Sequence, residues 1–336
     1  MATRKRRKKK KKLWAIPAGV AAVAVIALGG LVWHAVGSSG SKDDPSDTEN
    51  AVTAADVVWQ GKKYNYNDHL SNFLFIGVDN REKAETTKGQ ANAGQADALY
   101  LMSWDRVEGD VTVVSIPRDT MTQIEVFGPG GTSLGTVQDH VSLSYAYGDG
   151  DRESCELTVS AVKGLLYDLP IQGYCAINLD GLPVLTESVG GVNVTVPNDS
   201  LEEKYPEFKK GAQVTLNGEN TETFVRYRDI TVSQSALSRM ERQQEYIRAF
   251  GEAAKQAFAR NPGFVTKLYT SLDPYMVTNM GNDQFVKIME SVAGDDSSDN
   301  WTVPGEGVEG EHYDEYYVDD DALYEKVIET FYEEAE

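Results

Sequence analysis

The first 37 residues constrain the structure of the chain most, because a dense run of positive charge is followed there by a long uncharged segment. Arg4 to Lys12 is an unbroken run of nine basic residues. Leu13 to Gly37 follows without a charged side chain, apart from His34 when that residue is protonated. Twenty-five residues at helical rise exceed the roughly 30 Å hydrocarbon thickness of a bilayer, so this segment is long enough for one transmembrane helix.

The basic run also predicts how the chain is oriented. Lysines and arginines beside a membrane span stay on the cytoplasmic side. We therefore expect a single-pass protein of the cell membrane with a cytoplasmic N-terminus and an extracellular C-terminal domain. A cleaved signal peptide is the alternative, but the apolar segment is long for one and no clear cleavage motif follows it. An uncleaved anchor is favoured.

The rest of the chain is strongly acidic. Outside the basic run, 23 lysines and arginines face 52 aspartates and glutamates, a net charge of −29. That balance argues against a nucleic-acid-binding protein, which needs a basic surface. One stretch, FVRYRDITVSQSALSRMERQQ, nevertheless gathers four arginines: Arg226, Arg228, Arg239 and Arg242.

Strand and helix patterns alternate beyond the anchor, which predicts an α/β fold with a central mixed sheet flanked by helices. Short, mostly apolar runs predict strands at 72–78, 98–104, 111–117, 174–179, 192–196 and 222–228. Apolar residues at four-residue spacing predict helices over 157–165, 236–258 and 321–334. The expected organisation is a cytoplasmic segment 1–12, an anchor 13–37, a linker 38–56, a catalytic domain 57–260 and an acidic C-terminal extension 261–336.

The four arginines fall on two predicted elements. On a strand, Arg226 and Arg228 share one face. On the helix, Gln243 and Arg239 continue the apolar stripe of Ile247 at four-residue steps, and Arg242 lies beside them. Charges on inward faces need an opposite charge. Salt bridges to local carboxylates are the ordinary alternative, but two converging guanidinium sets fit a multivalent anion such as phosphate better.

Further polar residues lie where predicted strands begin or end. Asp79 and Arg81 follow the first strand, Asp97 precedes the second, and Arg118 follows the third. Ligands of α/β proteins gather at strand ends. Two carboxylates beside guanidinium groups suit Mg²⁺, which commonly bridges carboxylates and substrate phosphates.

The only two cysteines are Cys155 and Cys175. Thiols outside the cytoplasm tend to oxidise, so the sequence favours a disulfide between them. Two buried free thiols are the alternative.

The order of motifs NFLFIGVDNR, ADALYLM, VTVVSIPRD, LNGENTETFVRYRD and SRMERQQ resembles the LytR-CpsA-Psr family from Phe73 to Gln244. The resemblance implies an α/β/α sandwich that binds a polyprenyl pyrophosphate lipid. It further implies magnesium-dependent transfer of a glycopolymer, such as teichoic acid or capsular polysaccharide, onto a cell-wall acceptor such as a peptidoglycan hydroxyl, as a phosphodiester. The alternatives are a hydrolase of the same lipid and a non-catalytic membrane protein that binds wall polymers.

The resemblance assigns roles to the polar residues already named. It implies that Asp79 and Asp97 bind Mg²⁺, and Asp97 is also the candidate general base. The residues expected to bind the pyrophosphate are Arg118, Arg226, Arg228, Arg239 and Gln243, and Arg81 and Arg242 are expected to join them. At two positions the chain departs from the family pattern. Gln95 stands where an arginine is usual, Ser235-Ala236 stands where an aspartate is common, and Arg81 or Arg242 is expected to compensate for the missing charge.

Overall fold

The computed structural model describes residues 56–81, 86–229, 235–261, 263–294, 300–310 and 313–335. The basic segment, the expected membrane anchor and all but the last residue of the linker lie outside these residues. In the described part of the chain, no helix combines the length and apolarity that a membrane span requires.

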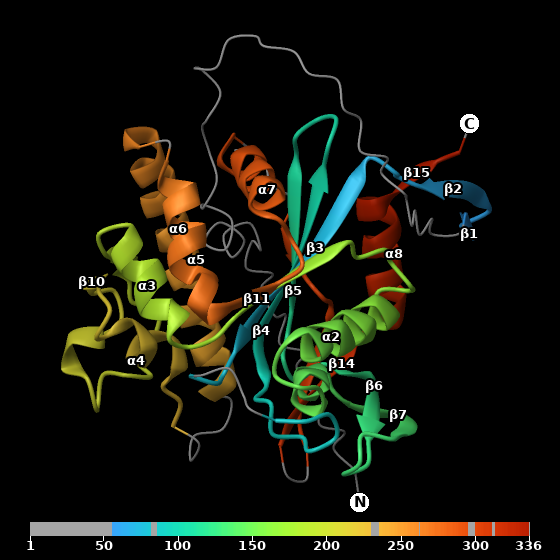
Figure 1. Cartoon of the computed structure of the whole chain (residues 1–336), viewed down its shortest axis with the longest axis horizontal. Coiled ribbons are helices and arrows are strands. Elements are labelled where there is room, and N and C mark those ends of the chain that lie inside the picture. The colour runs from blue at the N-terminus through green and yellow to red at the C-terminus, as the bar shows by residue number, and fades with distance from the viewer. Residues whose placement is uncertain are drawn as a thin grey trace, which may run out of the picture.

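A six-stranded mixed sheet forms the centre of the molecule (Figure 1). The strand order is β11-β8-β3-β4-β5-β12. The pairs β3–β4, β4–β5 and β8–β11 are antiparallel, whereas β3–β8 and β5–β12 are parallel. The strands are β3 (Leu70–Val78), β4 (Ala96–Asp105), β5 (Val111–Ile116), β8 (Gly173–Ile177), β11 (Met276–Thr278) and β12 (Trp301–Thr302).

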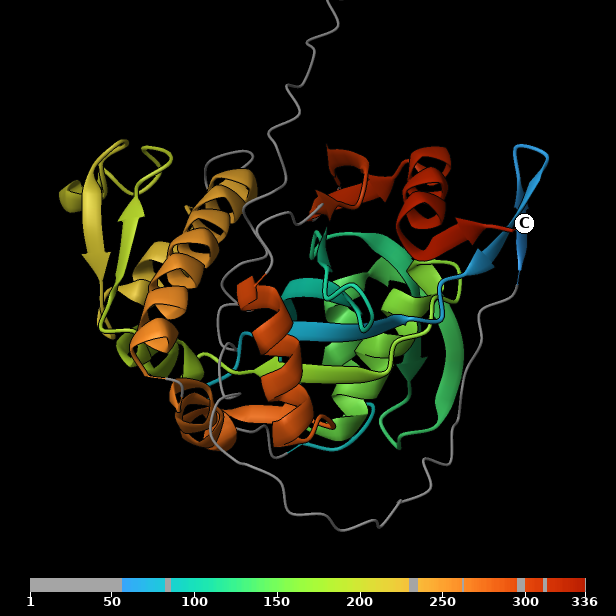
Figure 2. The same cartoon turned by 90° about the horizontal axis from the view of Figure 1, so that it is seen from above.

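Helices cover both faces of this sheet (Figures 1 and 2), so the predicted α/β/α arrangement is confirmed. One face packs against α3 (Gly181–Ser188), α5 (Ser235–Arg260), α6 (Phe264–Leu272) and α7 (Asn282–Gly294). The other face packs against α2 (Arg152–Leu165) and α8 (Asp320–Phe331).

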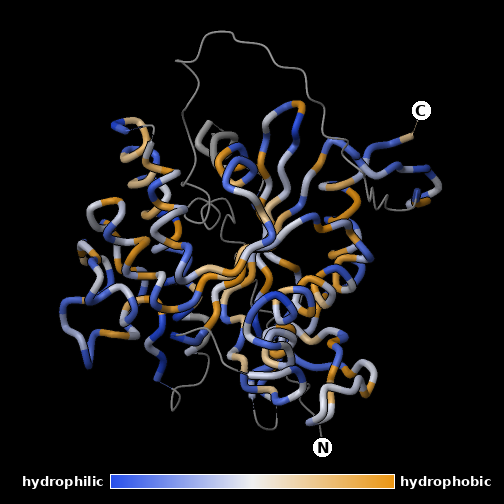
Figure 3. Tube along the Cα trace, in the orientation of Figure 1, coloured by the Kyte–Doolittle hydropathy of each residue, from blue (hydrophilic) through white to orange (hydrophobic). Residues whose placement is uncertain are grey.

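Alternating side chains divide the interior into two hydrophobic cores. Along β3, Phe73 and Phe75 point into the core under α5, whereas Leu74 and Ile76 point into the core under α2. Strands buried on both faces read as nearly continuous apolar runs. This is why the central strands appear hydrophobic along most of their length in Figure 3 and were predictable from the sequence.

Smaller elements surround the central sheet. β9 packs on α5 and pairs with β10, and β6–β7 forms a hairpin whose strand β6 lies beside α2. The remaining strands are β1 (Val57–Trp59), β2 (Lys62–Tyr66), β6 (Met121–Phe127), β7 (Ser133–His140), β9 (Val192–Thr195), β10 (Gln213–Leu216), β13 (Gly305–Glu309), β14 (Asp314–Val318) and β15 (Tyr332–Glu334). The remaining helices are α4 (Thr221–Arg226) and the 3-10 helices η1 (Val141–Tyr147), η2 (Pro206–Phe208) and η3 (Asp273–Tyr275).

The described residues of the segment 261–336, which was expected to be an extension, contribute to the same domain. β11 and β12 form the two edges of the central sheet. β15 pairs with β2 near the start of the described chain. Leu323, Val327 and Phe331 of α8 are buried as their four-residue spacing predicts, but α8 ends at Phe331 and the following residues form β15.

The strand predicted over 222–228 is wrong, because this segment begins with the helix α4. The ion pair Glu222–Arg226, four residues apart with an N–O distance of 2.7 Å, supports a helical turn. Phe224 and Val225 are both buried, so the run does not alternate between two faces. Arg226 therefore ends a helix and Arg228 follows in extended chain, and the two do not share a strand face.

The expected disulfide is not formed in the structure, where both cysteines are buried free thiols. Cys155 packs in the core under α2, and Cys175 packs in the core under α5. Because the two side chains pack in hydrophobic cores on opposite faces of the sheet, a disulfide between them would require the backbone to move.

Candidate functional site

A pocket of about 170 Å³ lies between the central sheet and the helices α3, α5 and α7. Its walls are almost entirely apolar and comprise residues of β3, β4 and β8, of these three helices and of α4. The pocket includes Asp97, Arg226 and Gln243 among its few polar lining residues. An apolar cavity that carries a carboxylate and a guanidinium suits an amphiphilic ligand with an apolar tail and an anionic head. The apolar lining comprises Phe75, Ile76, Gly77, Val78, Ala98, Tyr100, Cys175, Ile177, Leu179, Leu182, Leu185, Val225, Tyr246, Ile247, Phe250 and Phe285.

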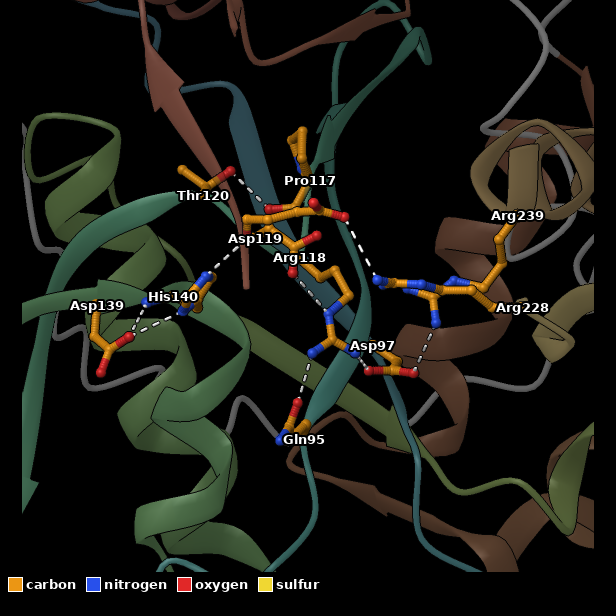
Figure 4. Close-up of polar contacts among 11 residues, drawn as sticks. Gln95, Asp97, Pro117, Arg118, Asp119, Thr120, Asp139, His140, Arg228 and Arg239 are labelled. Atoms are coloured by element: carbon orange, nitrogen blue, oxygen red, sulfur yellow. Dashed lines mark hydrogen bonds and ion pairs between the residues drawn. The ribbon is translucent and has the colours of Figure 1, made fainter. Parts of the chain in front are cut away.

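Arg118 is held in place by three polar side chains at the ends of two strands (Figure 4). Its Nη1 contacts the carboxylate of Asp97, its Nη2 donates to Gln95 Oε1 at 2.6 Å, and its Nε donates to Asp119 Oδ1 at 3.1 Å. Gln95, which stands where the family usually has arginine, thus accepts a hydrogen bond from Arg118. With all its nitrogen positions in use, the guanidinium is fixed in orientation.

Arg239 approaches the same carboxylate from α5. Its Nη1 lies 3.9 Å from Asp97 Oδ2, and its side chain is only 12% exposed. Burial lowers the pKa of Arg239, and the positive charges of Arg118 and Arg228 lower it further, against the opposing charge of Asp97. A buried cation in such surroundings favours an added anion, because a bound phosphate would offset the repulsion between the guanidinium groups.

Asp79 lies beside Asp97 but is held differently. Its Oδ1 accepts a hydrogen bond from the Gln95 main-chain nitrogen at 2.6 Å. Burial raises the pKa of Asp79 above its ordinary value, and the nearby charge of Asp97 raises it further, although the hydrogen bond from Gln95 opposes this. Gly94, at a φ of 93°, lets the chain pass closely, since a Cβ there would lie 3.0 Å from Asp79 Oδ1. A carboxylate whose charged form is disfavoured by burial and by a neighbouring carboxylate is suited to a cation.

Arg226 and Arg81 share one carboxylate. Glu222 accepts from Arg226 Nη1 at 2.7 Å and from Arg81 Nη2 at 2.7 Å. Arg81 also pairs with Asp180 at 3.1 Å, and its side chain is 58% exposed. Arg226 lines the pocket, whereas Arg81 is not one of its lining residues and is linked to Arg226 through Glu222.

Arg228 closes the cluster from the segment between α4 and α5. Its Nε donates to Ser235 Oγ at 3.1 Å, and its Nη2 lies 3.5 Å from Asp314 Oδ2. Ser235 occupies the position where the family often has aspartate, and here its hydroxyl accepts from the arginine. Asp314 belongs to β14, near the other end of the chain.

Arg242, expected to compensate for the missing charge beside the pyrophosphate, directs its guanidinium into the fold and not into this cluster. Its side chain is buried, and its Nε donates to the Phe224 main-chain oxygen at 2.7 Å. Its other nitrogens contact the carbonyls of Tyr227 and Ser238 and the hydroxyl of Ser200. Burial lowers the pKa of Arg242 to about 10, and the charge of Arg239 contributes. The residue caps the end of α4 and joins it to α5.

The structure thus brings together seven of the residues predicted from the sequence: Asp79, Asp97, Arg118, Arg226, Arg228, Arg239 and Gln243. Sequence reasoning missed the pocket lining, whose residue types match those of the core. It also missed the side chains that hold the arginines, namely Glu222, Ser235 and Asp314. Glu222 lies inside the motif LNGENTETFVRYRD, and Ser235 stands at a position that departs from the family pattern, but neither observation reveals a contact with an arginine. Asp314 lies 86 positions from Arg228 along the chain, where no local pattern links the two.

The fold and the site together define an α/β/α protein with an apolar pocket beside a cluster of guanidinium and carboxylate groups. A family model described as the LytR_cpsA_psr family matches residues 33–331. The chain belongs to the LytR-CpsA-Psr family.

The chain is also similar to proteins named as teichoic acid transferases. The chain is 30% identical over 262 residues to the polyisoprenyl-teichoic acid–peptidoglycan teichoic acid transferase TagT of Bacillus subtilis, a match covering 75% of this chain and 74% of TagT. It is 26% identical over 324 residues to the TagV transferase of the same species, covering 94% of this chain and 76% of TagV. It is 28% identical to the TagU transferase of Halalkalibacterium halodurans, covering 69% of this chain and 67% of that protein.

Solved structures show the same fold. The crystal structure of B. subtilis TagV matches with a TM-score of 0.58 at 23% identity, covering 78% of this chain and 97% of TagV. A structure of TagT described as bound to LI-WTA matches with a TM-score of 0.56 at 22% identity, covering 78% of this chain and 89% of TagT.

Proposed function

We propose that the protein is a phosphotransferase that moves a glycopolymer from a polyprenyl pyrophosphate carrier onto a cell-wall acceptor, with a peptidoglycan hydroxyl as the expected acceptor. The observation that carries this proposal is the apolar pocket with Asp97, Arg226 and Gln243 in its lining. Apolar walls suit the polyprenyl chain, and the guanidinium groups suit the pyrophosphate. The relatives named as teichoic acid transferases support the same class of substrate and acceptor.

The arginines would stabilise charge during the transfer. The acceptor hydroxyl attacks the phosphorus nearer the sugar, the new phosphodiester forms there, and polyprenyl phosphate leaves. Negative charge grows on the transferred and leaving oxygens, where Arg118, Arg226, Arg228 and Arg239 can hold it in fixed positions. Asp97 is the proposed acceptor of the hydroxyl proton, because it is the carboxylate that lines the pocket.

The site residues fit Mg²⁺ as a cofactor. Asp79 and Asp97 offer hard oxygen ligands, and the raised pKa of Asp79 reflects a carboxylate that a cation would favour in its charged form. The described residues contain no group of three or more His, Cys, Asp or Glu side chains able to hold a metal. Mg²⁺ keeps several waters and can bind through one or two carboxylates plus substrate phosphates, so Asp79 and Asp97 would be enough to hold it. When bound, the ion would neutralise phosphate charge.

We further propose that residues 13–37 anchor the protein in the cell membrane with its catalytic domain outside. The pocket would then lie on the side of the membrane where cell-wall polymers are assembled. Protease added to intact, wall-stripped cells should remove the C-terminal domain. Full protection of that domain from the protease would contradict the orientation.

The experiment that tests the function is a product analysis. Full-length protein in detergent is incubated with Mg²⁺, a polyprenyl-pyrophosphate-linked glycan and peptidoglycan fragments, and the products are separated by mass. A glycan joined to peptidoglycan through a phosphodiester supports the proposal. Free glycan phosphate with no acceptor adduct would identify a hydrolase, and tight binding of the lipid without any product would identify a non-catalytic binding protein. Arg239→Ala is the matched inactive control.

A further inference from the structure

The C-terminal hairpin β13–β14 is attached to the turn that carries Arg118. The Tyr316 main-chain nitrogen donates to the Asp119 carbonyl at 2.8 Å, and Tyr316 forms a parallel bridge with Thr120. The Tyr316 hydroxyl donates to the Val303 carbonyl at 2.7 Å, which ties the hairpin to the chain just before it. β14 is therefore held by main-chain contacts beside the arginine cluster and not by a few surface side chains.

A second set of contacts fixes the beginning of β14. His140 Nε2 lies 3.0 Å from the Asp314 carbonyl oxygen, and His140 Nδ1 lies 2.9 Å from Asp139 Oδ1 (Figure 4). The His140 side chain is 13% exposed. The histidine thus joins the end of β7 to the main chain of Asp314. This contact fixes the position from which the Asp314 side chain extends toward Arg228.

The Asp314 carboxylate reaches Arg228. The 3.5 Å contact between Asp314 Oδ2 and Arg228 Nη2 acts together with the hydrogen bond from Arg228 Nε to Ser235. Arginine has many rotamers, and it binds a phosphate best when its planar guanidinium group is correctly oriented toward the phosphate oxygens. Two contacts at different nitrogens of the same fork restrict that orientation. Both side chains are about one-third exposed, at 31% and 35%, so solvent weakens the pair without removing it.

We propose that Asp314 is a positioning residue of the arginine cluster and that β14 sets the spacing between Arg118 and Arg228. One strand is linked to both arginines. It hydrogen-bonds the main chain of Asp119, whose side chain accepts from Arg118, and the carboxylate of its own Asp314 contacts Arg228 directly. The two guanidinium groups come from separate parts of the chain, the end of β5 and the segment before α5. This inference rests on the proposed function, because it names the pyrophosphate as the ligand for which the arginines are spaced.

A competing role predicts the opposite result. If Asp314 only occupied Arg228 in place of the substrate, its removal would free a guanidinium and tighten the binding of anions. If Asp314 positions Arg228, its removal releases the fork, and the binding of a pyrophosphate weakens despite the more positive charge. The sign of the change in affinity therefore separates the two roles.

The test measures the affinity of the full chain, in detergent and with Mg²⁺, for farnesyl pyrophosphate, a soluble short-chain polyprenyl pyrophosphate. Asp314→Ala should weaken binding about tenfold, the order expected for a poorly oriented charge-assisted contact. Asp314→Asn, which keeps an oxygen acceptor, should fall between it and the parent. Glu306→Ala, an exposed acidic residue on β13 of the same hairpin, should match the parent. Melting temperatures verify that each variant is folded.

A double-mutant cycle makes the positioning role specific. In an Arg228→Ala background, Asp314→Ala should weaken binding no further, because the arginine that it positions is absent. Additive losses of affinity in the double variant would overturn the inference, and so would unchanged or tighter binding in the single Asp314→Ala variant.

Arg239→Ala in the same assay separates a failure of the positioning role from a failure of the proposed pyrophosphate site. If Arg239→Ala weakens binding and Asp314→Ala does not, only the positioning role fails. If neither does, the proposed pyrophosphate site itself fails.

Discussion

The buried guanidinium of Arg242 donates from Nε to the main-chain oxygen of Phe224 at 2.7 Å, and this contact joins α5 to α4. Arg239, one turn earlier on α5, uses its guanidinium in a different way and lies 3.9 Å from Asp97 in the site. Two arginines three residues apart thus have separate tasks. One stabilises the helix pair on which the site is built, and the other supplies charge to the site.

Arg242→Ala should lower the stability of the protein. Each buried carbonyl left without a donor costs about 1–3 kcal/mol, and Arg242 contacts three main-chain oxygens. Arg239→Ala should change the melting temperature little, since it removes a cation that burial and neighbouring cations already disfavour. Thermal unfolding of the two variants checks this contrast. Equal losses of melting temperature would mean that Arg239 also supports the fold.

The contribution of Glu222 to stability should depend on pH. Burial alone would raise the pKa of Glu222, but hydrogen bonds from Arg226 and Arg81 outweigh it, and the pKa lies below its ordinary value of 4.5. A depressed folded-state pKa gives stability that is present above the unfolded-state value and lost as pH falls through the folded-state value. Glu222→Gln should therefore lower the melting temperature at pH 7, and the difference from the parent should shrink below about pH 4.5. A difference that stays constant from pH 7 to pH 3 would contradict the ionic role.

The two cysteines should remain thiols in the folded protein. Burial raises the pKa of Cys175 to about 12, and burial together with the charge of Cys175 raises the pKa of Cys155 as well. Because the thiolate is the reactive form, neither residue should be alkylated by iodoacetamide at pH 8 in the native state. Both should react after denaturation. Rapid labelling of the native protein would contradict this prediction. So would a pair of peptides joined by a disulfide between Cys155 and Cys175 in secreted protein.

The parts of the fold that could be predicted are the strands and helices in which buried apolar residues recur at regular spacing. β3 and β5 are apolar on both faces, and the stripe through Ile247 and Phe258 on α5 is buried as its spacing requires. The segment 222–228 failed because a run of this length fits a strand and a helical turn equally well. Here a local ion pair and a buried pair of adjacent side chains favour the helix.

The site was only partly predictable for a related reason. Side-chain type and spacing placed Arg239 and Gln243 on the inward side of α5, and the structure agrees. The sequence also predicted that Arg242 lies on this inward side. It does not reveal whether a buried arginine lines a pocket or donates to a main-chain carbonyl. The contribution of Asp314 depends on a contact between residues 86 positions apart, which no local pattern records.

Leu182→Trp should separate the apolar part of the pocket from the anionic part. Leu182 lies half-buried on α3 and lines the pocket, so an indole there would fill space proposed for the polyprenyl chain. Displacing one five-carbon unit would lose on the order of 3 kcal/mol of apolar burial. Affinity for farnesyl pyrophosphate should fall, while affinity for inorganic pyrophosphate stays near that of the parent. Leu182→Met, which conserves volume, is the control. Equal losses for both ligands would mean that the tail binds elsewhere.

The last prediction concerns Arg226 and Arg239, which reach the site from α4 and α5. Arg226 lines the pocket beside Asp97, and Arg239 approaches that same carboxylate. If both bind one pyrophosphate, each removal should cost about 1.5–3 kcal/mol of binding free energy. Arg226→Lys should also weaken binding, because an ammonium does not reproduce the planar fork.

The two effects should be coupled, because each guanidinium polarises oxygens that the other also holds. A double-mutant cycle on Arg226 and Arg239, measured by affinity for farnesyl pyrophosphate with melting temperature in parallel, tests this directly. The double variant should lose less or more than the sum of the single losses by at least about 0.5 kcal/mol. If instead both variants lower the melting temperature and bind the lipid as the parent does, these arginines serve only their salt bridges to Glu222 and Asp97, and the pyrophosphate must bind elsewhere.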